Sequence, residues 1–443
     1  MAQTLPVTQA RTRILVVGGG YVGMYTALRL QKKLKPELRR RTVEIIVVDP
    51  RSYMTYQPFL PEAAAGSLEP RHVVVPLRRV LSSCEVLNGR VTKVDHARRV
   101  ARVVPTRGEP YDLTYEHIVL AAGSIARTLP IPGLAEMGIG FKQVEEAITL
   151  RNQVLEKLDI AASITDRELQ RCVLTFVFVG GGYAGIEALA ELEDMARYAT
   201  RYYEDISPAD LRFVLVEATG RILPEVGEDL GRYTVEELRK RNIDVRLNTR
   251  LESCVGGHIV LSDGDQFEAE TLVWTAGVKA NPVLSNTDLP VDERGRVRCR
   301  TDLRVEGVDG AWAAGDGAAV PDLTNPGQMC SPSAQHAVRQ AKQLGTNLAL
   351  VLQGRTPSAY IHKHVGSVAS LGLHKGVAQV YGIKLRGFPA WFMHRTYHVS
   401  RVPTFNRKVR VILDWTLSLF FKREVVSLGS LQDPRAEFSE ASR

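Results

Sequence analysis

The sequence predicts an α/β fold with two Rossmann-like domains and an amphipathic helical segment near the C-terminus. Three observations support this prediction. A short apolar strand that runs into a glycine cluster and then into a helix occurs twice in the 443 residues. Each copy is followed by a second apolar strand that ends in an acidic residue, and later by a third that ends in Ala-Gly. Two copies of one dinucleotide-binding domain are the simplest explanation.

The first copy begins with residues 13–17 (RILVV), which predict a buried strand, and continues through GGGYVG into a helix-like stretch. Gly18 permits a tight turn, Gly20 lets a pyrophosphate approach the backbone, and Gly23 lets helix and strand pack closely. The pyrophosphate would then lie at the positive N-terminal end of the helix. The second strand, VEIIVVD, ends at Asp49, a position that accepts hydrogen bonds from ribose hydroxyls.

The second copy begins with residues 175–179 (TFVFV) and continues through GGGYAG, so that Gly180, Gly182 and Gly185 repeat the three glycine positions. Its second strand, LRFVLVE, ends at Glu217. A lone GxGxxG motif is a weak signal. A glycine cluster between a strand and a helix, followed by a strand that ends in Asp or Glu, is a much more specific one.

The repeat extends further along both halves. The stretch YEHIVLAAGS predicts an apolar strand that ends at Ala122-Gly123, and LVWTAGV, which contains Gly277, is its counterpart. A turn-rich stretch that predicts a β-meander precedes each of these strands. Both halves therefore contain the same series of elements in the same order.

A further strand, VDGAWAAGDG, ends at Gly315-Asp316. An aspartate at such a turn can accept hydrogen bonds from a polyol, and this context resembles the element that holds the ribityl chain of FAD in flavoprotein reductases. The resemblance implies that the chain returns to complete the first domain. The expected domains are a discontinuous FAD-binding domain, 1–140 and 282–385, and an inserted NADH-binding domain, 141–281.

With these elements in place, the chain resembles the two-dinucleotide-binding flavoproteins of the pyridine nucleotide-disulfide oxidoreductase superfamily. Within them it is most similar to the type II NADH dehydrogenases, or NADH:quinone oxidoreductases, over about residues 13–425. Gln57, in YMTYQPFLPEAAAG, matches the family's Phe-Gln-Pro-Leu segment, with Tyr56 in place of Phe. Glu187 matches the family's glutamate in the NAD helix.

Two further positions come from the same resemblance. Ala334-Gln335 resembles the family's Ala-Gln quinone-site motif, whereas Gln340 and Gly345 match the family's second Gln and its Gly only approximately. Lys384 lies near a position where many members carry a lysine. The expected catalytic residues are therefore Glu187, Gln335 and Lys384.

The resemblance implies a reaction and its cofactors. Hydride would pass from the substrate NADH to tightly bound FAD, and two electrons would then pass to a membrane quinone of a respiratory chain, without proton pumping. Glu217 favours NADH because a carboxylate repels the 2′-phosphate of NADPH, although Arg221 lies nearby. The expected cofactor-binding residues are Gly18, Gly20, Gly23, Asp49, Gln57, Ala122, Gly123, Gly315, Asp316, Gly180, Gly182, Gly185, Glu217 and Gly277.

Three alternatives to this function remain open. One is a reductase of the same fold with a soluble acceptor such as a ferredoxin. The second is a sulfide:quinone reductase, which would use separated cysteines such as Cys172 and Cys330. The third is a sensor that binds FAD and NADH with little turnover. A dithiol reductase is disfavoured, because no cysteine occurs between Asp49 and Cys84.

Residues 386–430 predict an amphipathic membrane-association segment, followed by a tail, 431–443. Its apolar positions at near-helical spacing are Val409, Ile412, Leu413, Thr416, Leu419 and Phe420, and its aromatic residues include Trp391, Phe392, Trp415, Phe420 and Phe421. With basic residues at its ends, this pattern is typical of a helix in a membrane interface, next to anionic lipid. Packing on the protein's own surface or a homodimer contact is the alternative.

Composition narrows the class of protein further. The net charge is +8, but no nucleic-acid-binding motif accompanies it, so nucleic acid is not an expected partner. The basic run at 32–41 predicts a solvated loop. The five cysteines are well separated, which argues against a disulfide framework and a zinc site and fits a reducing compartment. No metal is expected. No stretch predicts a membrane span or a signal peptide, so we expect a peripheral protein at the cytoplasmic face of the cell membrane.

Overall fold

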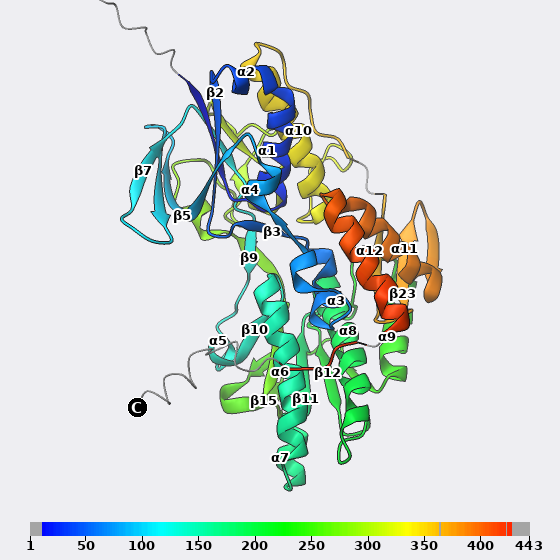
Figure 1. Cartoon of the computed structure of the whole chain (residues 1–443). Coiled ribbons are helices and arrows are strands. Elements are labelled where there is room, and N and C mark those ends of the chain that lie inside the picture. The colour runs from blue at the N-terminus through cyan, green and yellow to red at the C-terminus, as the bar shows by residue number, and fades with distance from the viewer. Residues whose placement is uncertain (1–10, 363–364, 422, 428–443) are drawn as a thin grey trace, which may run out of the picture. The chain divides into compact units, whose positions relative to one another are not determined.

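The computed structural model describes residues 11–362, 365–421 and 423–427, so the predicted tail, 431–443, lies outside the described residues (Figure 1). The chain forms two compact units. Unit 1 comprises Met1–Met54, Val75–Ile125 and Val278–His364, and unit 2 comprises Thr55–Val74, Ala126–Gly277 and Val365–Arg443. Unit 2 thus takes in segments 55–74, 126–140 and 365–385, which the sequence assigned to the FAD-binding domain; that assignment stays a prediction.

A seven-stranded sheet forms the centre of unit 1. In spatial order its strands are β20 (Ala311–Ala313), β8 (His117–Leu120), β1 (Thr12–Val17), β2 (Val43–Asp49), β5 (Glu85–Asp95), β6 (Val100–Pro105) and β7 (Tyr111–Thr114). The first five run parallel, whereas β5, β6 and β7 form the predicted antiparallel meander. The apolar residues of β1 and β2 are almost completely buried, as expected for parallel strands covered on both faces.

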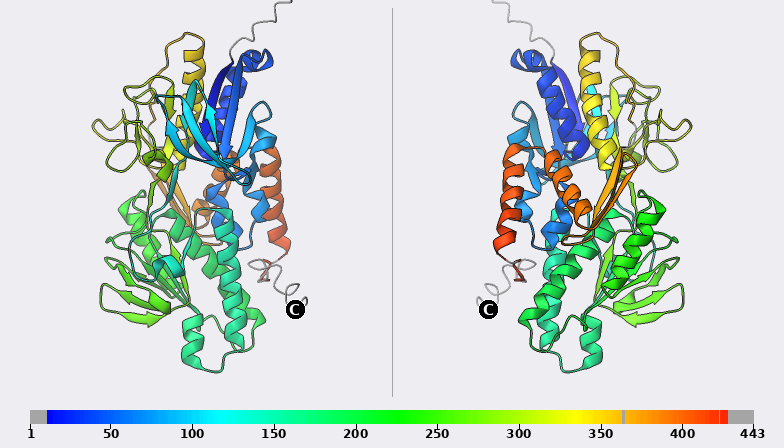
Figure 2. Two further views of the ribbon diagram at one scale, coloured as in Figure 1. Left: turned by 90° about the vertical axis from the view of Figure 1, so that its left-hand side faces the viewer. Right: turned by 90° about the vertical axis from the view of Figure 1, so that its right-hand side faces the viewer.

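Two long helices of unit 1 pack side by side against each other: α1 (Tyr21–Lys33) and α10 (Ala334–Leu352) (Figures 1 and 2). The contact is close, because a Cβ added at Gly345 would lie 2.9 Å from the Thr26 carbonyl oxygen. The Thr26 hydroxyl donates to the Ala341 carbonyl oxygen at 3.2 Å. Small residues thus let α10 lie directly on the helix that follows the first glycine cluster.

Shorter elements complete unit 1. The prediction of a loop throughout the basic run is wrong, because α2 (Lys35–Arg39) begins one residue before Pro36, a position where proline is compatible with a helix. Four further short elements are α4 (Leu77–Val80), β18 (Val278–Ala280), β19 (Val297–Arg298) and β21 (Ala318–Ala319). The chain passes from one unit to the other at three short strands, β3 (Tyr53–Thr55), β4 (Val74–Pro76) and β9 (Ser124–Ala126).

The main sheet of unit 2 repeats the order of four neighbouring strands of unit 1, β8-β1-β2-β5, whereas its edge strand comes from an earlier part of the chain than the other four. Its five parallel strands are, in spatial order, β10 (Gly138–Gly140), β17 (Thr271–Trp274), β11 (Thr175–Val179), β12 (Arg212–Val216) and β13 (Ile243–Arg246). The second predicted meander forms a separate antiparallel sheet of β14 (Leu251–Ser253), β15 (His258–Leu261) and β16 (Gln266–Glu268). The repeat in the sequence is therefore a repeat of topology.

Helices pack against the strands of unit 2. They are α3 (Leu60–Ala64), α5 (Leu134–Met137), α6 (Val144–Ala162), α7 (Arg167–Val173), α8 (Tyr183–Ala199) and α9 (Glu228–Lys240). Helix α8 follows the second glycine cluster and is buried on nearly all sides. Such a helix must satisfy any charged side chain that it buries.

The C-terminal part of unit 2 is an antiparallel sheet of β22 (Gly366–Ser370), β23 (Gly376–Val380) and β24 (Ile383–Arg386), followed by two helices. These are α11 (Phe388–Arg401) and α12 (Phe405–Phe420), drawn in orange and red (Figure 2). They occupy most of the predicted amphipathic segment. Among the described residues, none of the helices has the length and apolar character needed to cross a membrane.

Candidate active site and cofactor crevices

The first glycine cluster forms a tight turn between β1 and α1. Gly18 has φ +103°, and a Cβ there would lie 2.6 Å from the Ala121 carbonyl oxygen, so only glycine fits. A Cβ at Gly23 would collide with the carbonyl oxygen of Gly18. Gly20 has no protein atom within 4 Å of its ideal Cβ position and points into open space. The cluster therefore leaves a gap of the kind that a pyrophosphate needs.

The acid at the end of β2 is bound to this turn. Asp49 accepts hydrogen bonds from the amide of Gly19 at 2.7 Å and from the amide of Arg51 at 2.7 Å. Burial raises the pKa of the Asp49 carboxyl, while the two amide hydrogen bonds and the nearby Arg51 charge oppose the rise. The carboxylate thus closes the crevice on the side where a ribose would bind.

A third element of unit 1 completes the crevice. Asp316 lies in a 3₁₀ turn, Gly315–Gly317, directly after β20, and its carboxylate accepts a 2.6 Å hydrogen bond from the Ser124 hydroxyl. Asn281 donates its side-chain amide to the Ala122 carbonyl oxygen at 3.3 Å and its backbone amide to that of Gly123 at 3.1 Å. The predicted residues after β8 and β20 are therefore brought together, and the Asp316 carboxylate is an acceptor that fits the polyol hydroxyls of FAD.

Unit 2 repeats the glycine turn between β11 and α8. Gly180 has φ +115°, and its added Cβ would lie 2.7 Å from the Thr275 hydroxyl oxygen. A Cβ at Gly185 would collide with the Gly180 carbonyl oxygen, whereas Gly182 again has no protein atom within 4 Å. Gly277, after β17, has open space around it as well. The same three glycine positions thus have the same three environments as in unit 1.

The acid of the second crevice also binds its turn. Glu217 accepts from the Gly181 amide at 2.6 Å through one oxygen, and from the amide and hydroxyl of Thr219 at 2.8 Å each through the other. Arg221 donates instead to the carbonyl oxygens of Pro224 and Val226, at 3.3 and 2.7 Å. Its guanidinium therefore has backbone acceptors in this structure.

Glu187 lies one turn after the second glycine cluster and is buried. Its Oε1 accepts a 2.9 Å hydrogen bond from the Ser370 amide and lies 3.0 Å from His394 Nε2. A catalytic role for this glutamate stays a prediction. The position places its carboxylate between the nucleotide helix α8 and the C-terminal elements β22 and α11.

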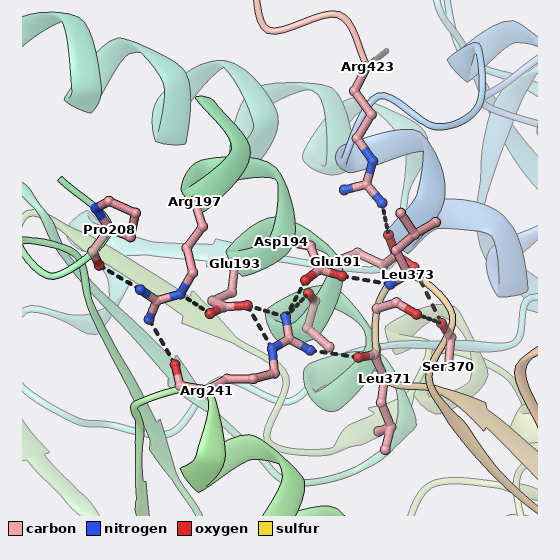
Figure 3. Close-up of polar contacts among 12 residues, drawn as sticks. Glu191, Glu193, Asp194, Arg197, Pro208, Arg241, Ser370, Leu371, Leu373 and Arg423 are labelled. Atoms are coloured by element: carbon pink, nitrogen blue, oxygen red, sulfur yellow. Dashed lines mark hydrogen bonds and ion pairs between the residues drawn. The ribbon is translucent and has the colours of Figure 1, made fainter. Parts of the chain in front are cut away.

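Glu187 is followed on α8 by further acids, Glu191, Glu193 and Asp194, whose polar contacts Figure 3 shows. Glu191 is fully buried; it pairs with Arg423 at 3.1 Å and accepts from the Ser370 hydroxyl at 3.3 Å. Burial raises the pKa of the Glu191 carboxyl, and the Arg423 charge opposes this. Glu193 binds Arg197 and Arg241, and Asp194 lies 2.9 Å from Arg241. Each buried acid on this helix thus has a positively charged partner or a hydrogen-bond donor.

The remaining predicted site residues lie in different places. Gln335 is half-buried in the first turn of α10, next to the exposed Ala334, in unit 1. Gln57 belongs to unit 2, where its side-chain amide donates to the Lys142 carbonyl oxygen at 3.1 Å. The Lys384 ammonium lies 2.8 Å from the Asp229 carboxylate at the start of α9. Lys384 therefore has a structural ion-pair partner.

The C-terminal helices divide their aromatic residues between two surroundings. Phe392, Leu413, Leu419 and Phe420 are exposed. Trp391 is buried, and Trp415 donates its indole N–H to Glu62 at 2.6 Å.

The reason for this arrangement is a buried cation. The Arg395 guanidinium lies over the rings of Trp391 and Trp415, 4.2 and 4.8 Å from their centroids, and pairs with the Glu62 carboxylate at 2.9 Å. Neither charge is more than a few per cent exposed. Stacking on two aromatic faces is a favourable environment for a desolvated guanidinium.

All five cysteines are free thiols: Cys84, Cys172, Cys254, Cys299 and Cys330. Burial raises the pKa of Cys330 to about 11. Burial, together with the charges of Glu270 and Glu268, also raises the pKa of Cys172. Both thiols are therefore mainly protonated at neutral pH, and a protonated thiol is a poor nucleophile. These environments disfavour the cysteine chemistry of a sulfide:quinone reductase.

Several residues of these sites were missed by the sequence reasoning. Ser124, Thr219, Glu62 and Arg395 make the polar contacts described above but were not among the predicted site residues. The serine directly follows Gly123 and could have been found as a hydroxyl at a strand end. The pairing of Glu62 with Arg395 spans 333 positions and leaves no local signal.

The fold is a Rossmann-type fold with two units, each of which has a glycine turn bound to an acid. Comparison with known proteins agrees. The family model described as "Pyridine nucleotide-disulphide oxidoreductase" matches residues 12–341. A type II NADH:quinone oxidoreductase of Staphylococcus aureus is 30% identical over 404 residues, which cover 89% of this chain and 96% of the relative. The corresponding protein of Mycobacterium tuberculosis is 28% identical over 430 residues, covering 93% of this chain and 89% of the relative.

Solved structures show the same fold. NDH2 from Plasmodium falciparum, solved in complex with NADH, superposes with a TM-score of 0.86 at 17% sequence identity and covers 94% of this chain and 100% of its own. The chain therefore belongs to the pyridine nucleotide-disulphide oxidoreductase family and, within it, to the type II NADH:quinone oxidoreductases.

Proposed function

We propose that this protein oxidises NADH and reduces a membrane quinone, with FAD as its resident cofactor. The observation that carries the proposal is the pair of crevices, in which the same glycine turn and the same amide–carboxylate bond occur twice. The family to which the chain belongs supports the assignment of the reaction.

FAD is assigned to unit 1, where Asp49, Ser124 and Asp316 would hold its ribose and ribityl hydroxyls. Bound there, FAD would supply a hydride acceptor for NADH and a donor of two electrons to a quinone, which takes up two protons as it is reduced to the quinol. The nucleotide is assigned to unit 2, where Glu217 binds the ribose and repels a 2′-phosphate. Arg221 donates to the backbone carbonyl oxygens of Pro224 and Val226.

The catalytic residues are proposed from the same arrangement. Glu187 is the buried carboxylate closest in the chain to the nucleotide turn, and it holds a position suited to hydrogen bonding or proton transfer. Gln335 is proposed to contact the quinone. Lys384 on β24 is the third candidate. Its ammonium forms an ion pair with the Asp229 carboxylate.

The test is oxidation of NADH by the purified full-length protein, measured with and without a short-chain quinone. We expect a yellow protein whose NADH oxidation depends on the quinone. A protein that contains FAD but reduces only a soluble electron carrier would contradict the quinone assignment. A flavin that NADH reduces and that no quinone reoxidises would favour a sensor.

We also propose that α12 binds the cytoplasmic surface of an anionic membrane. The helix exposes Ile412, Leu413, Leu417, Leu419 and Phe420, which are between 48% and 77% exposed. Its opposite side holds the buried Val411 and the indole of Trp415. Basic residues stand at its N-terminal end, at 407, 408 and 410. An exposed apolar face beside basic residues is typical of helices that lie in a membrane interface.

Sedimentation with vesicles tests this proposal. Full-length protein should bind vesicles that contain phosphatidylglycerol, and Leu413→Glu with Leu417→Glu should abolish binding while quinone reduction in solution persists. Leu169→Glu on α7, where the leucine is 47% exposed, is the matched control and should bind normally. Equal binding of all variants would contradict the proposal. A dimer in solution that the paired substitution dissociates would instead favour the homodimer contact.

A further inference from the structure

Gln340 is a buried amide that binds the Gly315-Asp316 turn. The residue lies on α10 and is 1% exposed. Its Oε1 accepts a 2.7 Å hydrogen bond from the backbone amide of Gly315. The side chain also hydrogen-bonds with the thiol of Cys330. A side-chain amide is seldom buried without such partners, because losing its hydrogen bonds to water is costly.

The turn that Gln340 binds has little room to adopt another conformation. Gly315 has φ +72°, and a Cβ there would lie 2.6 Å from a Val22 methyl group and 3.5 Å from the Ala337 methyl group. Val22 is in the first turn of α1, and Ala337 lies on α10 three positions before Gln340, on the same helix face. The turn is therefore held between the glycine helix and α10.

The two residues of the turn are fixed from opposite sides. Gln340 accepts from the amide of Gly315, and Ser124 donates to the carboxylate of Asp316. These two hydrogen bonds define both the direction of the peptide and the direction of the acid. Without the first, the Gly315 amide would lose its partner and the peptide could rotate.

We propose that Gln340 is a positioning residue for the flavin: it fixes the Gly315-Asp316 turn in the conformation that binds FAD. This inference rests on the proposed function, because it takes FAD as the ligand of unit 1. Gln340 contacts the turn and acts through Asp316. Replacing Gln340 should therefore lower the affinity for FAD more than it lowers the stability of the folded protein.

Asn347 on the same helix is the natural comparison. It is fully buried as well, and its side-chain amide donates to the carbonyl oxygens of Asp302 and Ser358, at 2.9 and 2.8 Å. Its partners are not part of the glycine turn or of the Gly-Asp turn. Replacing Asn347 therefore removes a buried hydrogen-bonding amide from α10 without touching the turn.

The experiment compares four full-length proteins: wild type, Gln340→Leu, Gln340→Glu and Asn347→Leu. The FAD dissociation constant, the visible circular dichroism of the flavin and the melting temperature of the flavin-free protein are measured for each. Gln340→Leu should weaken FAD binding about tenfold or more, because it leaves the Gly315 amide without an acceptor. Gln340→Glu retains an oxygen acceptor at the same place and should restore most of the affinity.

The outcomes separate the inference from the proposed function. Asn347→Leu should lower the melting temperature while it keeps the wild-type FAD affinity and dichroism. The positioning role would be overturned if Gln340→Leu also kept the wild-type FAD affinity and dichroism. It would be overturned as well if the two leucine variants lost FAD equally at equal melting temperature. In either case the assignment of FAD to unit 1 would stand. Wild-type protein that refuses FAD would instead overturn the proposed function itself.

Discussion

The two crevices share a plan and differ in what surrounds them. In both, a glycine turn follows the central strand, and an acid at the end of the next strand accepts from a glycine amide: Asp49 from Gly19, and Glu217 from Gly181. The edge strands also correspond, β20 in unit 1 and β10 in unit 2. Only β20 runs into a Gly-Asp turn, whereas β10 runs into the capping box that starts α6.

This difference indicates why related crevices would hold their ligands differently. In unit 1 the edge strand leads into the turn that carries Asp316, and Ser124 after β8 and Gln340 on α10 bind this turn. These added contacts suit a cofactor that stays bound. In unit 2 the equivalent strand leads into structural hydrogen bonds, so the crevice keeps the glycine turn and Glu217. A site with fewer fixed contacts suits a substrate that must leave after each reaction.

The largest expected effect comes from closing each crevice in turn. Gly20 and Gly182 have extended backbone and open space at the Cβ position, so valine fits the fold there and intrudes only on a ligand. Gly20→Val should yield a folded protein without FAD. Gly182→Val should retain FAD and lose reduction by NADH by about 100-fold or more.

Flavin content and stopped-flow reduction by NADH measure these effects, with melting curves as the check on folding. The comparison of the two crevices breaks down if Gly182→Val loses flavin while Gly20→Val keeps it.

The helices after the two turns differ as well, and a second prediction tests this. Helix α1 packs on α10 through small residues, whereas α8 buries acids paired with Arg241 and other cations (Figure 3). Arg241→Met should lower the free energy of unfolding by about 3–5 kcal/mol, because it leaves Glu193 buried without one of its partners.

Arg246→Met is the matched control. Arg246 pairs with Asp244, Asp263 and Asp265 on the surface of unit 2, where ion pairs are worth about 1 kcal/mol or less. Denaturant unfolding measures both variants, and similar losses for the two would contradict the account of α8.

A third prediction concerns the acid of the second crevice. Glu217→Ala removes the charge that repels a 2′-phosphate and one set of ribose contacts. We expect KM for NADH to rise about tenfold and the preference for NADH over NADPH to fall by a similar factor. Steady-state kinetics with both nucleotides check this. An unchanged ratio of kcat/KM for the two would show that Glu217 does not select the nucleotide.

A smaller effect is expected from pH. Burial and the neighbouring His394 hold the pKa of His398 on α11 well below its ordinary value. The folded protein therefore binds this proton less readily than the unfolded chain. The contribution of neutral His398 to the free energy of unfolding is complete above about pH 6.5, and it falls by about 1.4 kcal/mol per pH unit below that. Unfolding curves of wild type and His398→Gln across this range should differ in slope accordingly, and parallel curves would contradict the assignment.

The smallest expected effect is that of the cysteines. Because the pKa values of Cys172 and Cys330 are raised, neither thiol is expected to take part in the reaction. Alanine at both positions should leave quinone-dependent NADH oxidation within about twofold of wild type. A loss of activity at unchanged stability would bring the sulfide:quinone alternative back.

Local patterns predicted much of this molecule from the sequence. The apolar runs of β1, β2, β11 and β12 and the glycine clusters are local signals, and each is found in the structure where it was expected. The edge strand β10 is only Gly-Ile-Gly and carries no apolar run, so nothing in its sequence marks it as a strand.

The contacts that the sequence could not predict join distant positions. Gln340 binds a turn 25 residues earlier in the chain, and Arg395 binds Glu62 across 333 positions. The burial of Trp391 follows from Arg395, because the guanidinium needs aromatic faces around it.

The most direct test of the two-crevice account is an anaerobic titration of the purified full-length protein and of Gly182→Val with NADH, followed by the visible absorbance of oxidised flavin. The account predicts that one equivalent of NADH bleaches the flavin of the wild type and leaves the equally yellow variant oxidised. Bleaching of both proteins at the same concentration of NADH would contradict it, because the nucleotide would then reach the flavin without the crevice of unit 2.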